Sequence, residues 1–286
     1  MKLVAIDLDG TLLSKDGTIS VENAEAIREA QKWGHVITIA TGRSLHDTKQ
    51  ILLNAGLECP MITGNGAIVF HEGNLLENLV IPAIVLTEMK ALLERNHFYY
   101  EIYTNKGIFI LQEGRELLYK DIEAKKPEAY DFSMEQIDAE IEIQYNQYGL
   151  QYFIDFQNID FTNLEVYKLF VLTFDTNRMV MLRENLEGRE DISLTTSGKA
   201  KLEIGHPETS KGNALLFFAD HLGIPIEETV AIGDNLNDLS MFEVAGTSIA
   251  MENAEEAVKQ KSTYITTHHD ENGVAEALQK YIIRSL

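Results

Sequence analysis

The sequence contains a single cysteine, Cys59, so no disulfide can form within the chain. A lone cysteine of this kind fits a reducing compartment and is expected to be a small buried residue rather than a nucleophile. No apolar run approaches the ~20 residues that a membrane-spanning helix requires. The first residues reach an aspartate too early for the apolar part of a signal peptide. The sequence therefore predicts a soluble protein of the cytoplasm.

Basic residues are also scarce. There are 24 Lys and Arg against 45 Asp and Glu in 286 residues, which gives a formal net charge of -21. Nucleic acids and anionic membranes bind basic patches, so neither is expected as a partner. A small phosphorylated metabolite remains a candidate, because a local pocket can be cationic on an acidic protein. No long exposed apolar stripe is evident, so a monomer is the default expectation.

The first third of the chain alternates short apolar runs with helical patterns. Residues 3–6 form a continuous apolar run, which is typical of a strand buried on both faces. Helices are expected from Ser20 to Gly34 and from Ser44 to about Gly56, because each begins with a serine that can cap it. Further strands are expected over 36–40 and 61–63. This alternation predicts an α/β fold with a Rossmann-like, doubly wound parallel sheet.

The pattern changes near Pro82 and returns near Asp191. Between these points helices over 85–96 and 176–185, a hairpin about residues 105–107 and two further strands are expected, while the stretch from 113 to 150 has no clear assignment. Hairpins mixed with helices are typical of an α+β unit. We therefore expect a discontinuous core, residues 1–81 plus 190–286, with an inserted domain over 82–189.

Polar residues follow three of the expected core strands, namely residues 3–6, 36–40 and a further apolar run over 229–232. The polar residues are Asp7-Leu8-Asp9-Gly10-Thr11, Thr41-Gly42-Arg43 and Gly233-Asp234. In open parallel sheets, ligands collect at the carboxyl ends of the strands. Aspartates from two strand ends repel each other unless a cation lies between them, and a few oxygen ligands suit Mg²⁺.

Each of these motifs, taken alone, is weak evidence for a functional site. An Asp-x-Asp sequence is often a solvated turn, Thr41 and Gly42 are ordinary turn residues, and a single lysine such as Lys211 is commonly a surface charge. Gly233-Asp234 could be only a loop with a capping aspartate. All four occur in one order, each at an expected strand end or helix start, and together they indicate a common site.

This combination resembles the haloacid dehalogenase superfamily of phosphohydrolases, and its details resemble the Cof-type branch. The matching residues are Asp7 to Thr11, Thr41, Lys211, and Gly233-Asp234 with Asn237 and Asp238. Segments 40–43, 65–67, 210–212, 233–238, 250–254 and 270–274 look like signatures of that branch. The likeness covers both flanks of the chain. The middle matches only in length and position, where the branch carries a C2-type cap that sets substrate specificity.

The resemblance implies a role for each matching residue. Asp7 would be the nucleophile that forms an aspartyl-phosphate, and Asp9 would be the general acid and base. Mg²⁺ would be held by Asp7, Asp234 and the backbone carbonyl of Asp9. Lys211, Thr41 and the backbone amides after Asp7 would bind phosphate oxygens. Asn237 and Asp238 would orient the metal and Lys211, or cap a helix.

Several residues are weaker candidates for substrate binding. Arg43 could reach substrate or form a structural ion pair, and Asn65 and Asn253 could contact phosphate or cap their loops. Leu8, Gly10 and Gly42 are included because they lie within the motifs. The histidines His46, His268 and His269 are expected to be solvated, and Tyr99, Tyr100, Glu101 and Tyr103 to be core residues unless they enter a pocket.

The sequence thus predicts a Mg²⁺-dependent phosphatase that hydrolyses phosphate monoesters of small metabolites, such as sugar, cofactor or nucleotide phosphates. The second aspartate, Asp9, favours a phosphatase over the ATPases of the superfamily, which carry threonine at that position. Two alternatives stay open: a phosphosugar mutase, which shares the second aspartate, and a phosphate- or metal-binding regulator without turnover.

Overall fold

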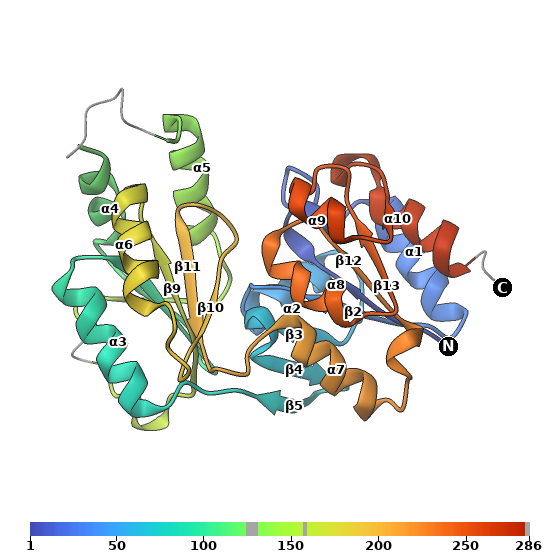
Figure 1. Ribbon diagram of the computed structural model, residues 1–286, viewed down its shortest axis with the longest axis horizontal. Coiled ribbons are helices and arrows are strands. Elements are labelled where there is room, and N and C mark those ends of the chain that lie inside the picture. Colours follow the sequence, from blue (N-terminus) through green and yellow to red (C-terminus); the bar gives the residue numbers. More distant parts are fainter. Residues whose placement is uncertain (124–130, 157–158, 284–286) are drawn as a thin grey trace. The chain divides into compact units, whose positions relative to one another are not determined.

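The computed structural model describes residues 1–123, 131–156 and 159–283. The chain divides into two compact units (Figure 1). The first unit consists of Met1–Asn78 and Thr209–Leu286, and the second of Leu79–Glu208. The α/β fold class with a parallel sheet, predicted from the sequence, is confirmed.

The first unit is built on one eight-stranded sheet with the order β14-β13-β12-β1-β2-β3-β4-β5. Its neighbours are parallel from β14 to β3, and β4 and β5 add an antiparallel edge. The bounds of the strands are β1 Leu3–Ile6, β2 Val36–Ala40, β3 Met61–Thr63, β4 Ile68–His71, β5 Asn74–Asn78, β12 Thr229–Gly233, β13 Thr247–Ala250 and β14 Tyr264–Ile265. All residues of β1 are buried, as expected for a central strand.

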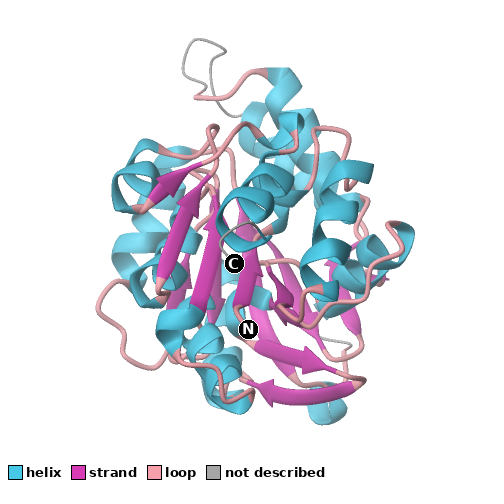
Figure 2. Cartoon of the chain, turned by 90° about the vertical axis from the view of Figure 1, so that its right-hand side faces the viewer, coloured by secondary structure: helices cyan, strands magenta, loops and turns pink. Residues whose placement is uncertain are grey.

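Helices connect the parallel strands and cover the sheet (Figure 2). Their bounds are α1 Val21–Lys32, α2 Leu45–Asn54, α7 Lys211–His221, α8 Leu239–Val244, α9 Glu256–Lys261 and α10 Gly273–Leu278. The chain moves from β1 toward β3 in one direction and from β12 toward β14 in the other. Right-handed crossovers therefore place the connecting helices of the two halves on opposite faces. The carboxyl ends of β1 and β12 lie side by side where the order reverses.

The second unit contains a six-stranded sheet with the order β10-β11-β9-β6-β7-β8. The strands are β6 Tyr99–Thr104, β7 Gly107–Leu111, β8 Leu150–Phe153, β9 Val166–Leu172, β10 Ser193–Thr195 and β11 Lys201–Gly205. Its helices are α3 Ala83–Arg95, α4 Gly114–Glu123, α5 Met134–Tyr145 and α6 Thr176–Leu186. Apolar residues of α3 and α6 pack against one face of β6, β9 and β11 and form a core separate from that of the first unit.

The insert extends further along the chain than the sequence pattern suggested. Strand β11 pairs with β9, and β10 pairs with β11, so both strands belong to the sheet of the second unit. The second unit therefore ends at Glu208 rather than at residue 189. These two strands are short, and β10 is only partly buried, so neither has the apolar run that marks the core strands.

The stretch from 113 to 150 contains helices α4 and α5, and its residues 124–130 lie outside the described part of the chain. The aromatic residues of β6 are buried: Tyr99, Tyr100 and Tyr103 expose at most 2% of their surface. Tyr99 donates a hydrogen bond to the buried Glu101 at 2.8 Å, and burial raises the pKa of Glu101 to about 7. Tyr99, Glu101 and Tyr103 form a polar layer inside the second unit, whereas Tyr100 packs in its apolar core.

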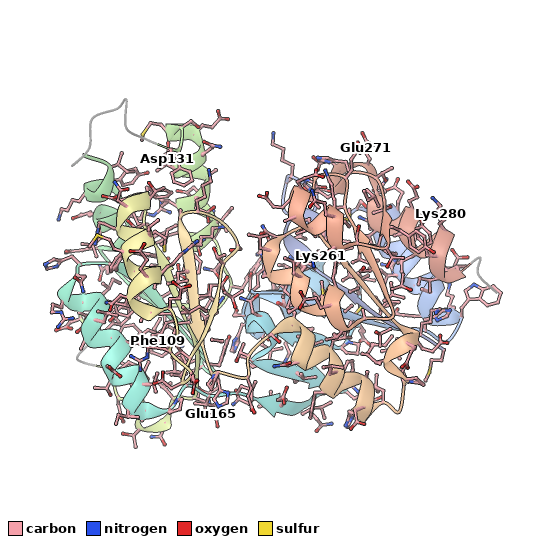
Figure 3. The ribbon with its side chains drawn as sticks, in the orientation of Figure 1. Phe109, Asp131, Glu165, Lys261, Glu271 and Lys280 are labelled. Atoms are coloured by element: carbon pink, nitrogen blue, oxygen red, sulfur yellow. The ribbon has the colours of Figure 1, made fainter. Side chains whose placement is uncertain are left out.

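Charged side chains such as Lys261, Glu271 and Lys280 are exposed on the first unit (Figure 3). Among the described residues, no helix has both the length and the apolar character that crossing a membrane would demand.

Candidate active site

The site begins at the end of β1. The backbone amide of Asp7 donates to the carbonyl of Ile232 at 3.0 Å, which ties the end of β1 to the end of β12. Asp7 is 4% exposed. The chain then turns through Leu8–Leu12 with Gly10 at a φ of +79°, a backbone conformation that favours glycine. The sharp turn directs both Asp7 and the loop after it to the edge of the sheet where Asp234 also lies.

Lys211 is the first residue of α7, whose N-cap is Ser210. Its Nζ lies 2.7 Å from Oδ1 of Asp7 and 2.6 Å from Oδ1 of Asp238, and its side chain is fully buried. Burial lowers the pKa of Lys211, but the carboxylates of Asp238 and Asp7 outweigh burial and raise it above the usual range. Lys211 is therefore charged at neutral pH and fixed against Asp7.

Asp238 holds this lysine in place. Its Oδ2 accepts hydrogen bonds from the backbone amides of Asp234 at 2.9 Å and Asn235 at 3.0 Å, while its Oδ1 faces Lys211. Both carboxylate oxygens are thus engaged by groups of the protein. A side chain at Gly233 would collide with the Asp238 carboxylate, so glycine is required there. Asp238 caps its own loop and orients Lys211.

Asp234 completes a group of three carboxylates. Its Oδ1 accepts a hydrogen bond from the hydroxyl of the buried Thr11 at 2.8 Å. One oxygen each from Asp7, Asp234 and Asp238 lies within 4.8 Å of the others. A Cβ at Gly10 would collide with the Asp234 carboxylate, so the turn after Asp7 is shaped around it.

The electrostatics of this group fit a bound cation. Burial raises the pKa of Asp7 well above its ordinary value, and the nearby Asp238, Asp234 and Asp9 raise it further, while Lys211 lowers it. Burial and Asp238 raise the pKa of Asp234 to about 7. A single lysine does not offset three carboxylates. Asp238 is already engaged, so Asp7 and Asp234 are the residues that fit a hard divalent cation such as Mg²⁺.

Asp9 lies outside this group of carboxylates. Its side chain is 56% exposed and is paired with Arg43, whose Nη2 lies 2.7 Å from Oδ1 and whose Nε lies 2.9 Å from Oδ2. Arg43 also contacts Oδ2 of Asp47 at 2.7 Å. Although burial lowers the pKa of Arg43, the Asp9 and Asp47 carboxylates raise it overall. Arg43 is therefore an ion-pair residue here, the second of the two roles expected for it.

Thr41 lies at the end of β2, where its backbone amide donates to the carbonyl of Ile62 at 2.9 Å. The threonine is fully buried, and its hydroxyl accepts the backbone amide of Arg43 at 3.1 Å. Gly42 faces the amide of Asn65, which a side chain at Gly42 would crowd. These contacts link the loop after β2 to the loop after β3.

The two candidate asparagines, Asn65 and Asn253, form hydrogen bonds with residues of neighbouring loops. Asn65 has a φ of +59°, and its Oδ1 accepts from Nδ2 of Asn237 at 3.2 Å. Oδ1 of Asn237 is buried and has no hydrogen-bond partner within the described ranges. Asn253 donates to the carbonyl of Gly10 at 2.8 Å and accepts the backbone amide of His269 at 3.1 Å. Asn253 therefore braces the turn after Asp7.

Three contacts were not foreseen from the sequence. Asp47, 1% exposed, anchors Arg43 from the first turn of α2, and the i, i+4 spacing of the pair was the available signal. Thr11 was recognised as part of the motif but not as the partner of Asp234. His269, expected to be solvated, has a side chain only 17% exposed, and its Nδ1 lies 2.7 Å from the carbonyl of Leu13.

Cys59 is not part of this site. Burial raises the pKa of its thiol to about 12, and Nε2 of Gln31 lies 3.6 Å from its Sγ. The thiol is therefore protonated at neutral pH, and Cys59 is partly buried rather than fully buried as the sequence suggested.

Comparisons with known proteins show which family the chain resembles in sequence and fold. A family model described as haloacid dehalogenase-like hydrolase matches residues 4–278. Phosphatase YwpJ of Bacillus subtilis (strain 168) is 35% identical over 282 residues, covering 98% of this chain and 99% of that protein. The 5-amino-6-(5-phospho-D-ribitylamino)uracil phosphatase YwtE of the same strain is 36% identical over 276 residues, covering 96% of each.

A solved structure of a haloacid dehalogenase-like hydrolase from B. subtilis superimposes with a TM-score of 0.87 at 34% identity, covering 98% of this chain and 100% of that one. The family model and both relatives extend over nearly the whole chain, including the insert. The chain therefore belongs to the haloacid dehalogenase-like hydrolases, as a phosphoric monoester hydrolase of that family.

Proposed function

We propose that this protein is a Mg²⁺-dependent phosphatase that transfers the phosphoryl group of small-metabolite monoesters to Asp7. The observation that carries the proposal is the placement of Lys211. Its Nζ lies 2.7 Å from Oδ1 of Asp7, in a buried site that also contains the carboxylate of Asp234. A phosphate monoester carries up to two negative charges, so a carboxylate can attack it only where positive charge is fixed beside it.

Asp7 and Asp234 would hold the Mg²⁺, together with the backbone carbonyl of Asp9. The ion would supply positive charge that offsets the charge of the phosphate and of the two carboxylates. The buried Oδ1 of Asn237 supports this assignment, because an oxygen in the loop after Asp234 that finds no partner in the described part of the chain suits a hydrated cation.

The residues of the chain would divide the work of phosphoryl transfer. Asp7 attacks the phosphorus, the bond to the leaving oxygen breaks, and Asp9 gives that oxygen a proton. Lys211 and Thr41 bind phosphate oxygens, with backbone amides of the Leu8–Gly10 turn. A water then attacks the phosphorus of the aspartyl-phosphate and gives its proton to Asp9, which releases inorganic phosphate and regenerates Asp7. To reach the leaving oxygen and the water, the Asp9 carboxylate has to leave its ion pair with Arg43, and its exposed side chain leaves room for that rotation.

We assign substrate selection to the second unit, residues 79–208, as a C2-type cap. YwtE is named for a phosphorylated ribitylamino-uracil, which supports a small phosphorylated metabolite as the substrate class for this chain. Sugar phosphates, cofactor phosphates and nucleotide phosphates are further candidate substrates of this class.

The test is phosphate release from p-nitrophenyl phosphate and from a panel of these metabolites, with and without Mg²⁺. We expect turnover that requires a divalent metal and disappears in Asp7→Asn. Asp220→Asn, at an exposed position of α7, is the matched control and should keep wild-type activity. Turnover that survives Asp7→Asn would contradict the mechanism.

The same panel separates the two alternatives. A phosphosugar mutase would need a sugar bisphosphate as activator and release little inorganic phosphate. A regulator without turnover would release none, whichever metal is added. The names of the two B. subtilis relatives, both phosphatases, favour hydrolysis over either.

A further inference from the structure

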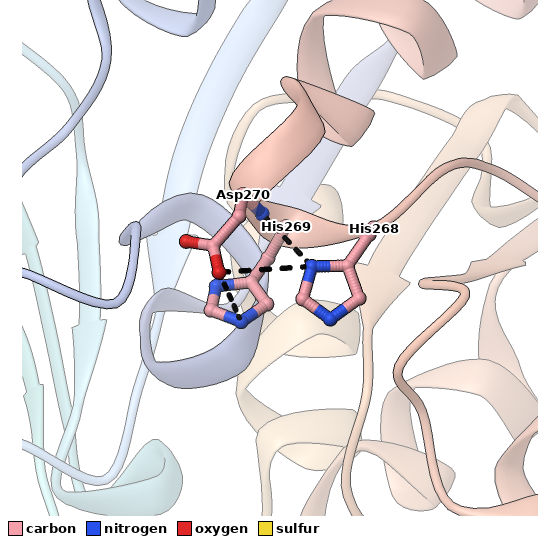
Figure 4. A group of neighbouring side chains, drawn as sticks. All are labelled: His268, His269 and Asp270. Atoms are coloured by element: carbon pink, nitrogen blue, oxygen red, sulfur yellow. Dashed lines mark hydrogen bonds and ion pairs between the residues drawn. The ribbon is translucent and has the colours of Figure 1, made fainter.

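A second group of ligand-type side chains lies in the loop before α10, formed by His268, His269 and Asp270 (Figure 4). Oδ2 of Asp270 lies 3.9 Å from Nδ1 of His268 and 3.8 Å from Nε2 of His269. All three ligand atoms lie within 4.8 Å of one another. The side chains of His268 and Asp270 are 36% and 38% exposed, so an ion from solvent can reach them.

The hydrogen bonds of His269 fix which nitrogen can bind a metal. Its Nδ1 lies 2.7 Å from the carbonyl oxygen of Leu13. A carbonyl oxygen only accepts, so Nδ1 carries the proton and Nε2 keeps its lone pair in the neutral ring. Metal-binding histidines commonly donate their other ring N–H to a backbone carbonyl in this way. The Nε2 left over is the atom that faces Asp270.

Asp270 is oriented in the same manner. Its Oδ1 accepts the backbone amide of Lys15 at 2.7 Å, so Oδ2 is the oxygen turned toward the two imidazoles. The bonds to Leu13 and Lys15 come from one hairpin, closed by a bridge between Leu13 and Ile19. Two of the three ligands are therefore held by backbone groups of a neighbouring segment, as expected for a built site.

We propose that His268, His269 and Asp270 form a binding site for a divalent transition metal of the Zn²⁺ class, separate from the Mg²⁺ site at Asp7 and Asp234. Imidazole nitrogens suit Zn²⁺, Ni²⁺ or Cu²⁺, whereas Mg²⁺ prefers oxygen ligands. Zn²⁺ binds nitrogen and carboxylate oxygen at ~2.0–2.2 Å, so ligand atoms of a tetrahedral site are roughly 3.3–3.5 Å apart. The two separations from Oδ2 of Asp270, 3.9 Å and 3.8 Å, need to shorten by about half an ångström. One weak bond gives way, the 3.2 Å contact from the amide of Asp270 to Nδ1 of His268.

The site has a direct connection to the catalytic loop. The backbone amide of His269 is held by Asn253, which also donates to the carbonyl of Gly10 in the turn after Asp7. A bound ion would therefore restrict the motion of the hairpin that contains Leu13 and Lys15. It would also hold Asn253 in place against the turn after Asp7. The ion is expected to slow the exchange of the Lys15 amide with solvent, because that amide bonds to a ligand.

The experiment is calorimetric titration of Zn²⁺ into untagged, chelator-treated protein in saturating Mg²⁺. We expect one equivalent to bind in the wild type and in Asp234→Asn, because Asp234 belongs to the other site. His268→Gln and Asp270→Asn should each weaken Zn²⁺ binding at least about tenfold. Asp270→Asn keeps an oxygen for the Lys15 amide, so its effect reports ligation rather than loss of the hairpin contact.

His221→Gln is the matched control, since it removes an exposed histidine outside the group and should leave Zn²⁺ affinity unchanged. Hydrogen exchange adds a second readout: Zn²⁺ should protect the Lys15 amide in the wild type and not in Asp270→Asn. Zn²⁺ binding that is lost in Asp234→Asn, or equal in His268→Gln, Asp270→Asn and wild type, would overturn the proposal. Each readout is independent of phosphatase activity.

Discussion

At the scale of single residues, Gly10 offers a sharp test of how the site is shaped. Gly10 and Gly17 have almost the same φ, +79° and +78°, so alanine strains the backbone equally at both. Only at Gly10 would the added Cβ meet another residue, the Asp234 carboxylate, whereas nothing lies within 4 Å at Gly17. The difference between the two variants therefore isolates the position of Asp234.

Gly10→Ala should lower kcat/KM for p-nitrophenyl phosphate on the order of 100-fold, because Asp234 is displaced from its place beside Asp7. Gly17→Ala should lose about 1 kcal/mol of folding stability from backbone strain and keep its activity. Steady-state kinetics and urea unfolding of both variants provide the measurements. Equal activity of the two would show that the turn does not position Asp234.

The residues of the site were largely predictable from the sequence because strand ends of a parallel sheet meet at one edge. Asp7, Asp234 and Lys211 were expected to converge, and the structure brings them together. The partner of Arg43 was not predictable, because the choice between substrate and Asp9 depends on side-chain direction. The anchoring role of Asp47 depends in turn on which face of α2 is buried.

At the scale of elements, a buried hydrogen bond links a side chain of α1 to the backbone of α10. Asn23 of α1 is fully buried, and its Oδ1 accepts the backbone amide of Ala275 at 2.9 Å. This amide belongs to the first turn of α10, where backbone N–H groups have no partner within the helix. Asn23 therefore supplies the hydrogen bond that the start of α10 needs.

Asn23→Ala should lower the free energy of unfolding by about 1–3 kcal/mol, because it leaves the Ala275 amide buried without a partner. Asn23→Asp keeps the accepting oxygen and, in a buffer acidic enough to keep its buried carboxyl protonated, should lose less. Urea unfolding followed by circular dichroism would measure both, with an unchanged m-value as the sign of a common unfolded state. If the two variants lose the same stability, the hydrogen bond is not the cause.

Elements were predictable wherever apolar periodicity was strong. The residues expected for β2 and β3 form those strands, and Ser20 and Ser44 cap the helices that follow them. Helices α4 and α5 were missed because few of their positions are apolar. Ile137 and Ile141 of α5 are nevertheless fully buried, so the i, i+4 signal was present but short.

At the scale of the whole molecule, folding and metal binding are linked through Asp234. Its pKa rises from an ordinary 3.8 to about 7 in the folded protein, chiefly because of burial and then of Asp238. Between these values the folded protein keeps a proton that the unfolded chain has lost. The stability of the metal-free protein therefore falls as the pH rises through this range.

Stabilisation by Mg²⁺ should therefore grow as the pH rises toward and past about 7, because the ion replaces the lost proton at Asp234. Thermal unfolding at several pH values, with Mg²⁺ and with chelator, would measure the shift in Tm. Asp234→Asn cannot ionise at this position and should show a smaller shift that depends less on pH than that of the wild type, because Asp7 still titrates. A shift that is the same at every pH would contradict the linkage.

The division into two units was foreseen, but its boundary was not, since β10 and β11 lie beyond the expected end of the insert and pair with β9. Pairing between strands distant in sequence has no local signal in a short segment. The core of the first unit, by contrast, is formed by apolar runs that the sequence displays directly.

The central claim is that Asp7 carries the phosphoryl group during turnover. The most direct measurement is acid quenching of the enzyme during turnover of p-nitrophenyl phosphate, followed by mass spectrometry of the peptide that contains Asp7. We expect the mass of one phosphoryl group on Asp7, more of it in Asp9→Asn because hydrolysis slows, and none in Asp7→Asn. Turnover in the wild type with no phosphoryl group on Asp7 in either the wild type or Asp9→Asn, or with the group on another residue, would contradict the claim.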